Sequence, residues 1–205
     1  MKKGMTITYE VDGALYVNST NRCSNRCEFC IRNNGDGAYG SDSLWLTREP
    51  TADEMVESIL SRDLKKYREI VFCGYGEPSY RLPDIVQVSK RVKAEYDIPV
   101  RINTNGHSDL IFGRDTSEDY RGAFDTVAIS LNTPNPERYV EICHPVFKDQ
   151  AFDALLSFAR NVKNCVQNVT FSVVRETLTE DEIKECQRIA DECGVLLRVR
   201  DYISG

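Results

Sequence analysis

The stretch "EIVFCGYGEPSYRLPDIVQVSKRVKAEYDIPVRINT" (residues 69–104) contains one complete strand–helix–strand pattern. Short apolar, β-branched runs at 69–74 and 99–104 predict two strands, and residues 82–96 between them have their apolar side chains at helical spacing. Pro83 lies near the first turn of that helix, where proline is tolerated. Two strands joined by a helix pair in parallel through a right-handed crossover. The glycine-containing loop at 74–81 therefore follows the carboxyl end of a strand.

The same alternation recurs along the chain. Further strand patterns lie at 14–19, 126–132, 168–174 and 195–200. Capping-box signals at Thr51 and Thr179 begin two more helices, of which the first has an apolar stripe from Val56 to Tyr67. Another apolar stripe covers 152–162, and Gly194 supplies a helix stop. Six strands alternating with helices predict a single α/β domain over 1–205, a partial (β/α)6 barrel with parallel strands. A doubly wound open sheet is the alternative.

Composition excludes several classes of protein. The chain has 205 residues, of which 41% are hydrophobic and 28% charged, as expected of one globular domain. The net charge of −6 argues against a general nucleic-acid-binding surface. We find neither an apolar run long enough to cross a membrane nor a signal peptide, so we expect a cytoplasmic protein with no membrane partner. In that compartment the eight cysteines do not predict a disulfide framework.

Three of these cysteines are clustered in "NRCSNRCEFCIRN" (21–33), where Cys23, Cys27 and Cys30 have the spacing C-x3-C-x2-C. A structural zinc site needs four ligands, usually from paired knuckles, and an electron-carrying iron–sulfur cluster also takes four cysteines. No second knuckle exists, and His107 has no partner at metal-ligand spacing. Three thiolates suit a [4Fe–4S] cluster whose fourth iron is open to another ligand.

With an aromatic residue, Phe29, before its last cysteine, this motif resembles the signature of the radical S-adenosylmethionine (radical SAM) enzymes. The resemblance implies that Cys23, Cys27 and Cys30 ligate the cluster and that SAM chelates the open iron. It further implies that an electron from the cluster cleaves SAM to a 5′-deoxyadenosyl radical, which abstracts hydrogen from a substrate. The predicted cofactors are therefore a [4Fe–4S] cluster and S-adenosyl-L-methionine.

Three other segments carry the resemblance further. "GYGEP" (74–78) resembles the family's GGEP element, and "NTNG" (103–106) and "SLN" (130–132) follow the next two predicted strands. Arg175 is a further candidate, for the SAM carboxylate. The resemblance implies SAM contacts at Phe29, Gly74, Gly76, Glu77, Pro78, Asn105, Ser130, Asn132 and Arg175.

The match can be narrowed. "LYVNSTNRCSNRCEFCIR", "ISLNTPNPERY" and "LRVRDY" are similar to the small radical SAM proteins named for association with TatD-type metal-dependent hydrolases. This resemblance implies a minimal SAM-cleaving core with a functional link to such a hydrolase. It supplies no substrate.

Several reactions stay open. The substrate is either a small molecule in the barrel mouth or a protein partner that the enzyme activates or modifies. A third candidate is a 7-carboxy-7-deazaguanine-synthase-like reaction, but Ile31 and Arg32 replace the Asp-Thr pair that binds magnesium in those enzymes. A non-catalytic metal-binding module is the candidate from outside the superfamily.

Two groups of arginines suggest partners. Arg22, Arg26 and Arg32 surround the cysteines and would receive an acidic, low-potential electron donor of the flavodoxin or ferredoxin type. Arg198 and Arg200 share one face of the last predicted strand. If that face lines the barrel, they would bind a carboxylate or phosphate of the substrate. The alternative is that these arginines are solvated surface charges.

The remaining candidates are other cysteines and the loop that follows the cysteine cluster. Cys143 either donates a hydrogen atom or proton in the active site or is a partly buried loop thiol. Cys165, Cys186 and Cys193 have the spacing of core residues. The polar loop 31–46 either orders over a ligand or is an exposed linker.

Overall fold

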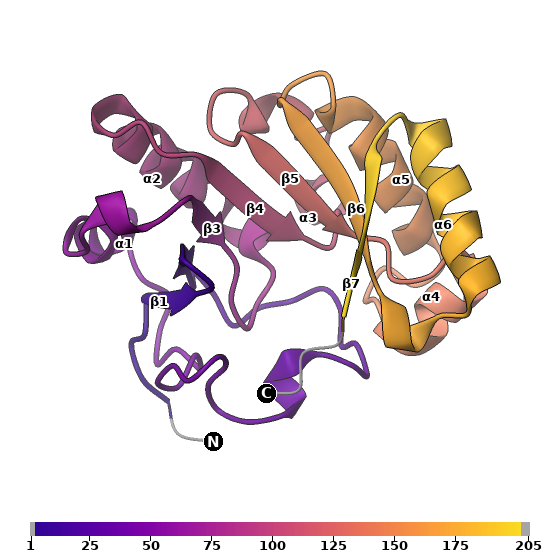
Figure 1. The fold of residues 1–205 in the computed structure, drawn as a ribbon, viewed down its shortest axis with the longest axis horizontal. Coiled ribbons are helices and arrows are strands. Elements are labelled where there is room, and N and C mark those ends of the chain that lie inside the picture. The colour runs from indigo at the N-terminus through magenta and orange to yellow at the C-terminus, as the bar shows by residue number, and fades with distance from the viewer. Residues whose placement is uncertain (1–2, 202–205) are drawn as a thin grey trace.

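A computed structural model of the protein describes residues 3–201, which form a single curved sheet with helices packed against it (Figure 1). The strands are β1 (Thr8–Val11), β2 (Ala14–Val17), β3 (Ile70–Phe72), β4 (Val100–Thr104), β5 (Thr126–Ser130), β6 (Asn168–Val174) and β7 (Leu196–Arg200). Their order in the sheet follows their order in the sequence, and every pair from β2 to β7 is parallel.

The six predicted strands are β2 to β7, so the partial barrel is confirmed. The alternative of a doubly wound sheet is wrong, because the strand order has no reversal. Strand β1 was not predicted. It pairs antiparallel with β2 through a two-residue turn, Asp12–Gly13, in which both residues have positive φ, as this type of hairpin turn requires.

The helices are α1 (Ala52–Leu60), α2 (Leu82–Glu95), α3 (Ser108–Phe112), α4 (Pro136–Cys143), α5 (Gln150–Val162) and α6 (Glu180–Cys193). Both predicted capping boxes form, at Thr51 and at Thr179, and Gly194 ends α6 with a φ of 68°. The first helix is shorter than its apolar stripe predicts. It ends at Leu60, whereas Leu64 lies in a separate 3-10 turn, Leu64–Lys66, and Tyr67 directly follows that turn.

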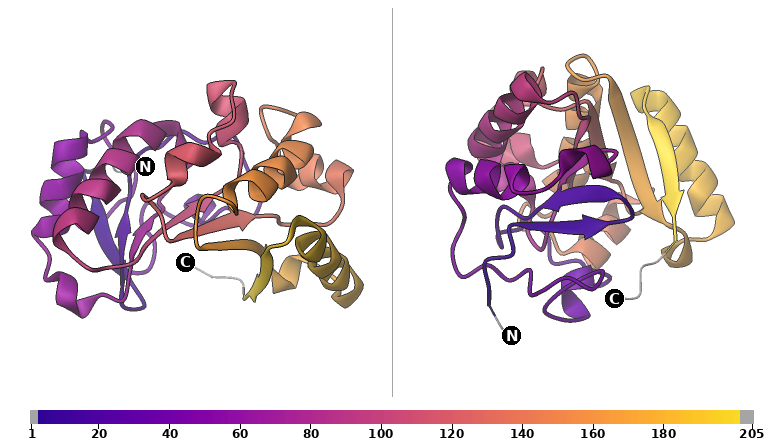
Figure 2. Two further views of the ribbon diagram at one scale, coloured as in Figure 1. Left: turned by 90° about the horizontal axis from the view of Figure 1, so that it is seen from above. Right: turned by 60° about the vertical axis from the view of Figure 1, so that its left-hand side comes forward.

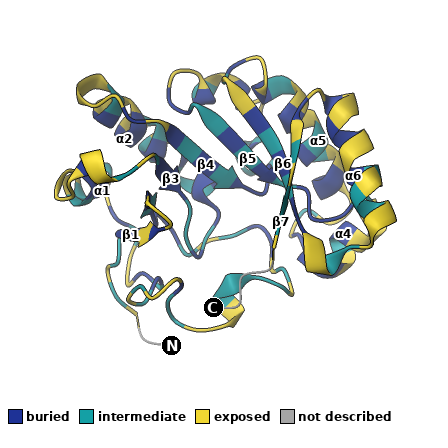
Figure 3. Cartoon of the chain, in the orientation of Figure 1, coloured by how far each residue is buried: buried dark blue, intermediate teal, exposed yellow. Residues whose placement is uncertain are grey.

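The two faces of the sheet differ in polarity because side chains alternate along each strand. One face, which includes Ile102 and Phe171, packs against the helices in the main apolar core (Figure 2). Cys186 and Cys193 belong to this core, as predicted. The outward surfaces of the helices are exposed, as Figure 3 shows for α6. The other face, which we call the inner face, carries polar side chains that are only half-buried, among them Arg101, Asn103, Ser130 and Ser172.

Candidate functional site

The loop that follows β2 contains the three clustered cysteines. Cys23, Cys27 and Cys30 are all partly exposed, and the Cys30 N–H donates to the Cys27 carbonyl over 3.2 Å in a tight turn. Burial raises the pKa of the Cys23 thiol to about 12. A bound metal would therefore be needed to hold it as a thiolate at neutral pH.

Among the residues from 3 to 201, no three His, Cys, Asp or Glu side chains are placed to share one metal ion. A [4Fe–4S] cluster makes a different demand, because each cysteine binds a separate iron and the sulfurs lie farther apart than the ligands of a single ion. Three thiols in one partly exposed loop are a donor set that fits such a cluster.

The GYGEP segment after β3 packs directly on the cysteine loop. The Glu77 N–H donates to the Arg22 carbonyl over 2.7 Å. A Cβ added to Gly76 would lie 2.3 Å from the Thr20 carbonyl oxygen and 2.6 Å from that of Arg22. A Cβ on Gly74 would similarly meet the Asn18 side chain at 2.1 Å. Glycine is thus required at both positions for the two loops to touch.

The Glu77 carboxylate is buried and already has three protein donors. Its Oε1 accepts from the Thr104 hydroxyl at 2.7 Å and the Ser79 N–H at 3.0 Å, and its Oε2 accepts from the Asn105 N–H at 2.7 Å. Burial raises the pKa of Glu77, and these donors oppose that effect. Through its side chain, Glu77 joins the ends of β3 and β4.

In the described part of the chain, five buried side-chain oxygens have no hydrogen-bond partner, and three of them, Asn18 Oδ1, Ser19 Oγ and Asn25 Oδ1, lie in the segment that follows β2. The other two are Ser79 Oγ, in the loop after β3, and the Tyr120 hydroxyl, in the apolar core. Buried polar atoms are rarely left unsatisfied, so the segment after β2 suits a polar ligand. Together with the thiols, these atoms fit an iron–sulfur cluster with a polar cofactor beside it.

A buried network that the sequence did not predict ties the cysteine loop to the ends of later strands. The His107 ring nitrogens lie 3.2 Å from the Ser24 hydroxyl and 3.2 Å from the Tyr139 hydroxyl. The Asn25 side chain donates to Tyr139 over 3.1 Å, and that of Asn105 to Ser24 over 2.7 Å. Desolvation lowers the pKa of His107 to about 4, so the ring is neutral at physiological pH. The only sequence signal for this network was the polar run after β4.

The other predicted SAM contacts have different surroundings. Asn132 is buried with a φ of 66°, and its side chain donates to the Cys143 sulfur over 3.3 Å. Ser130 is half-buried on the inner face, Phe29 packs against the main core, and Pro78 is buried. The structure therefore places Pro78 after the end of β3 and Ser130 and Asn132 at the end of β5. It gives the side chains of Glu77, Asn105 and Asn132 protein partners.

Arginines lie at the far edge of the sheet. Arg198 and Arg200 are on the inner face, since Leu197 and Val199, which alternate with them along β7, pack toward the helices. Arg198 is in register with Ser172 and, through it, with Ser130. Arg175 is half-exposed and pairs with Glu180 at 3.4 Å and with Asp201 at 3.9 Å.

Farther down the inner face, an ion pair and a thiol lie side by side. The Arg101 guanidinium makes two bonds to Glu69, of 2.9 and 3.0 Å, and a third of 2.6 Å to the Asn103 side chain. Cys73 is half-buried at the end of β3, where burial raises its pKa and a hydrogen bond from Asn103 opposes that effect. In the sequence, the signal for this group was the pair of polar residues, Arg101 and Asn103, inside the otherwise apolar strand β4.

The loop 31–46 is fixed to the barrel by a second, smaller apolar cluster formed by Tyr9, Val11, Ala38, Leu44 and Tyr75. The Tyr75 hydroxyl also donates to the Gly35 carbonyl over 3.0 Å, and the Tyr75 ring packs edge-on against Trp45. This loop is thus packed against the hairpin β1–β2 and is not an exposed linker.

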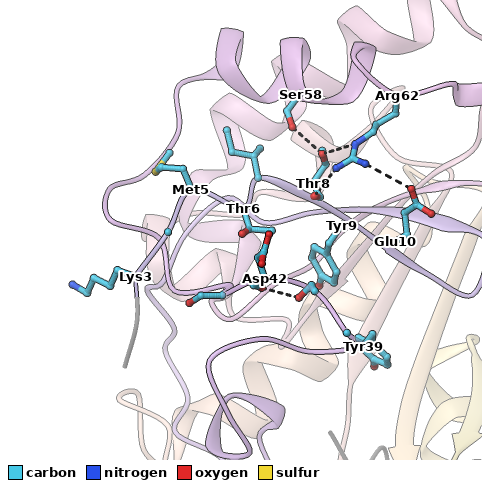
Figure 4. A pocket seen from close by; sticks show the side chains of 15 residues that line it. Lys3, Met5, Thr6, Thr8, Tyr9, Glu10, Tyr39, Asp42, Ser58 and Arg62 are labelled. Carbon is cyan, nitrogen blue, oxygen red and sulfur yellow. Dashed lines mark hydrogen bonds and ion pairs between the residues drawn. The ribbon is translucent and has the colours of Figure 1, made fainter.

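A hollow of about 820 Å³ lies between β1, the turn 39–43 of this loop and the end of α1 (Figure 4). Residues 3–10, the turn at 39–43, Ser58 and Arg62 line it, and it includes none of the predicted cluster or SAM residues. Among the described residues, no helix is long and apolar enough to cross a membrane.

Comparisons with known proteins identify the family to which the chain belongs and agree with the partial-barrel fold. A family model described as "Radical SAM superfamily" matches residues 17–189. A GTP 3′,8-cyclase of Clostridium perfringens is 28% identical over 201 residues, which are 96% of this chain and 56% of that protein. The chain therefore spans about half the length of the curated relatives it matches.

Solved structures share the fold. A radical SAM methyltransferase from Sphaerobacter thermophilus superimposes with a TM-score of 0.67 at 20% identity, over 94% of this chain and 57% of that one. Streptococcus suis SuiB, bound to its precursor peptide SuiA, gives a TM-score of 0.68 at 19% identity, over 93% of this chain and 39% of that one.

Proposed function

The chain belongs to the Radical SAM superfamily, and on that premise we propose that residues 1–205 form a core that binds a [4Fe–4S] cluster and SAM and cleaves SAM reductively. When bound, the two cofactors together supply a 5′-deoxyadenosyl radical that abstracts hydrogen from a substrate. The observation that carries this proposal is the direct packing of the GYGEP segment on the cysteine loop, with Glu77 N–H bonded to the Arg22 carbonyl.

Each element of the site has a proposed role. Cys23, Cys27 and Cys30 hold the cluster. The backbone from Gly74 to Pro78 forms the wall against which the methionine part of SAM binds, and Glu77 keeps that wall in place. Ser130 offers SAM a hydroxyl from the inner face. Asn105, Asn132, Phe29 and Arg175 complete the predicted SAM contacts.

Radical SAM enzymes need a reductant, and we propose an acidic flavodoxin or ferredoxin as the donor. Of the three arginines near the cysteines, Arg32 donates to the backbone of Asn25 and Arg22 pairs with Glu49. Arg26 is exposed and has no side-chain partner among the described residues, so it is available to a docking protein. Arg26→Glu should slow SAM cleavage driven by flavodoxin and leave cleavage driven by dithionite unchanged. Equal slowing with both reductants would contradict this docking site.

We also propose an anionic substrate on the inner face. Arg198 and Arg200 point to that face, Arg198 in register with Ser130, and related proteins include enzymes named for GTP. Equilibrium dialysis with GTP as the anionic probe compares wild type with the Arg198→Ala, Arg200→Ala double variant. Equal binding by both would refute the role of these arginines. A link to a TatD-type hydrolase and a cytoplasmic location stay predictions.

The decisive experiment is anaerobic reconstitution with iron and sulfide, followed by detection of 5′-deoxyadenosine after addition of SAM and dithionite. We expect wild type to produce it and Cys27→Ala to lose both iron and product. The matched control is Cys165→Ala, since Cys165 contacts Glu118 and Arg121 instead of the cysteine loop. The proposal would be contradicted if the wild-type protein takes up zinc but no iron, or if it holds a cluster without cleaving SAM.

A further inference from the structure

The side chain of Arg32 folds back over the cysteine loop. Arg32 follows Cys30 by two residues and lies in the 3-10 turn Ile31–Asn33. Its Nη2 nevertheless donates to the carbonyl of Asn25, seven residues earlier in the chain, over 3.1 Å. The guanidinium therefore reaches from the end of the cysteine motif to the segment between its first two cysteines.

The same guanidinium also faces the GYGEP segment. Its Nη1 lies 3.5 Å from the carbonyl oxygen of Tyr75, the second residue of that segment. The Arg32 charge is thus located where the cysteine loop and the GYGEP segment meet, beside the proposed site of both cofactors.

Both ends of the Arg32 side chain are attached to the cysteine loop. Next to its backbone, the Asn33 N–H donates to the Cys30 carbonyl over 2.9 Å. At its far end, Asn25 accepts from the guanidinium through its carbonyl and donates through its N–H to the Cys23 sulfur over 3.4 Å. Because these two groups belong to one residue, the guanidinium lies within about 11 Å of the Cys23 sulfur.

The three arginines near the cysteines differ in how far their charge is neutralised or screened. Arg32 is half-buried, and both acceptors of its guanidinium are uncharged carbonyl oxygens. Arg22 by contrast pairs with Glu49 at 2.6 Å, and Arg26 is exposed to water. A carboxylate partner cancels most of a charge at a distance, and water and salt screen an exposed charge. Arg32 is therefore the arginine whose charge acts most strongly on the cysteine loop.

We propose that the fixed positive charge of Arg32 raises the reduction potential of the [4Fe–4S] cluster. This inference rests on the proposed function, because it requires the three cysteines to hold such a cluster. Reduction by one electron adds one negative charge to the cluster and its thiolates, so a nearby cation stabilises the reduced form more than the oxidised form. Arg32 thus favours the transfer of the electron, while Arg26 stays available to the donor protein.

The test is a titration of the reconstituted cluster with dithionite, monitored by electron paramagnetic resonance without SAM. We expect Arg32→Gln, which keeps a donor amide but loses the charge, to take up as much iron as wild type and to have a more negative midpoint potential. The expected loss is about tenfold in the equilibrium constant for reduction, which is a shift of about 59 mV for one electron. Arg32→Lys keeps the charge and should stay near the wild-type potential.

The matched control is Arg26→Gln, which makes the same chemical change on an exposed side chain next to Cys27. Its shift should be smaller, and it should vanish when the ionic strength is raised from about 0.1 M to about 1 M, where the Debye length falls from about 10 Å to about 3 Å. The shift in Arg32→Gln should persist at the higher ionic strength, because a half-buried charge is screened less.

A full cluster with the wild-type potential in Arg32→Gln would overturn the inference. Equal shifts in Arg32→Gln and Arg26→Gln, or in Arg32→Gln and Arg32→Lys, would also overturn it. If Arg32→Gln takes up no iron, the lysine variant decides: a wild-type potential supports the role of the charge and a more negative potential contradicts it. These failures differ from a failure of the proposed function, in which wild type itself assembles no cluster or cleaves no SAM.

Discussion

The two faces of the sheet are built from the same strands but have different roles. In β6, Phe171 is fully buried against the helices, whereas Ser172 beside it is half-buried on the inner face. In β4, Ile102 is in the apolar core while Arg101 and Asn103 on either side bond to polar groups. Because side chains alternate between faces, neighbouring residues can be selected for separate properties. Stability depends chiefly on the helix-covered face, and binding depends on the inner face and the strand ends.

The largest effect should come from breaking the contact at the strand ends. Gly76→Ala places a methyl group within 2.3 Å of the Thr20 carbonyl oxygen, and both nearby groups are backbone, so the GYGEP segment must move away from the cysteine loop. We expect the variant to lose most of its bound iron after reconstitution, measured as iron per chain. The control is Gly35→Ala, whose added Cβ would be 3.8 Å from the nearest backbone oxygen. Wild-type iron content in Gly76→Ala would show that the two loops need not touch.

A pair of adjacent substitutions in β6 tests the difference between the faces directly. Phe171→Ala removes a fully buried ring from the main core and should lower the free energy of unfolding by about 3–5 kcal/mol. Ser172→Ala, on the inner face, should change it by less than about 0.5 kcal/mol. Urea titration of the metal-free chain measures both. Similar losses at the two positions would mean that the inner face is also a packed core.

This division explains how much could be predicted from the sequence. Strands β2 to β7 were recognised because each has a local apolar pattern, and the cysteine and glycine motifs could be placed at strand ends. Strand β1 was missed because four residues, TYEV, alternate too briefly. The helix α4 was missed because its eight residues form only two turns.

The hydrogen-bond partners of the site residues also could not be predicted from the sequence. Glu77, Asn105 and Asn132 were predicted as ligand contacts, but their side chains bond to protein groups that are distant in the sequence. Asn105 donates to Ser24, 81 residues away, and the Glu77 carboxylate accepts from Thr104, 27 residues away. No local pattern encodes such pairings, because they depend on which strand ends the fold brings together.

The smallest effect concerns a polar residue, His107, that is buried beyond the end of β4. His107 has an ordinary pKa of 6.5 when unfolded and about 4 when folded, because burial disfavours the imidazolium. Between these values the unfolded chain binds a proton that the folded chain does not, so stability falls as the pH is lowered from about 6.5 toward 4. Going from pH 7 to pH 5 should cost about 2 kcal/mol through this residue.

Urea titrations of the metal-free chain at pH 7 and pH 5 measure this loss in wild type and in His107→Gln. The glutamine variant should be less stable at pH 7, because it disturbs the bonds to Ser24 and Tyr139, but its stability should depend less on pH by the same 2 kcal/mol or so. Phe171→Ala is the matched control, since it lowers stability equally at both pH values and should keep the wild-type difference between them. If His107→Gln keeps that difference as well, His107 takes up its proton in the folded protein, and the network around Ser24 tolerates a charge at the junction of the cysteine loop and β4.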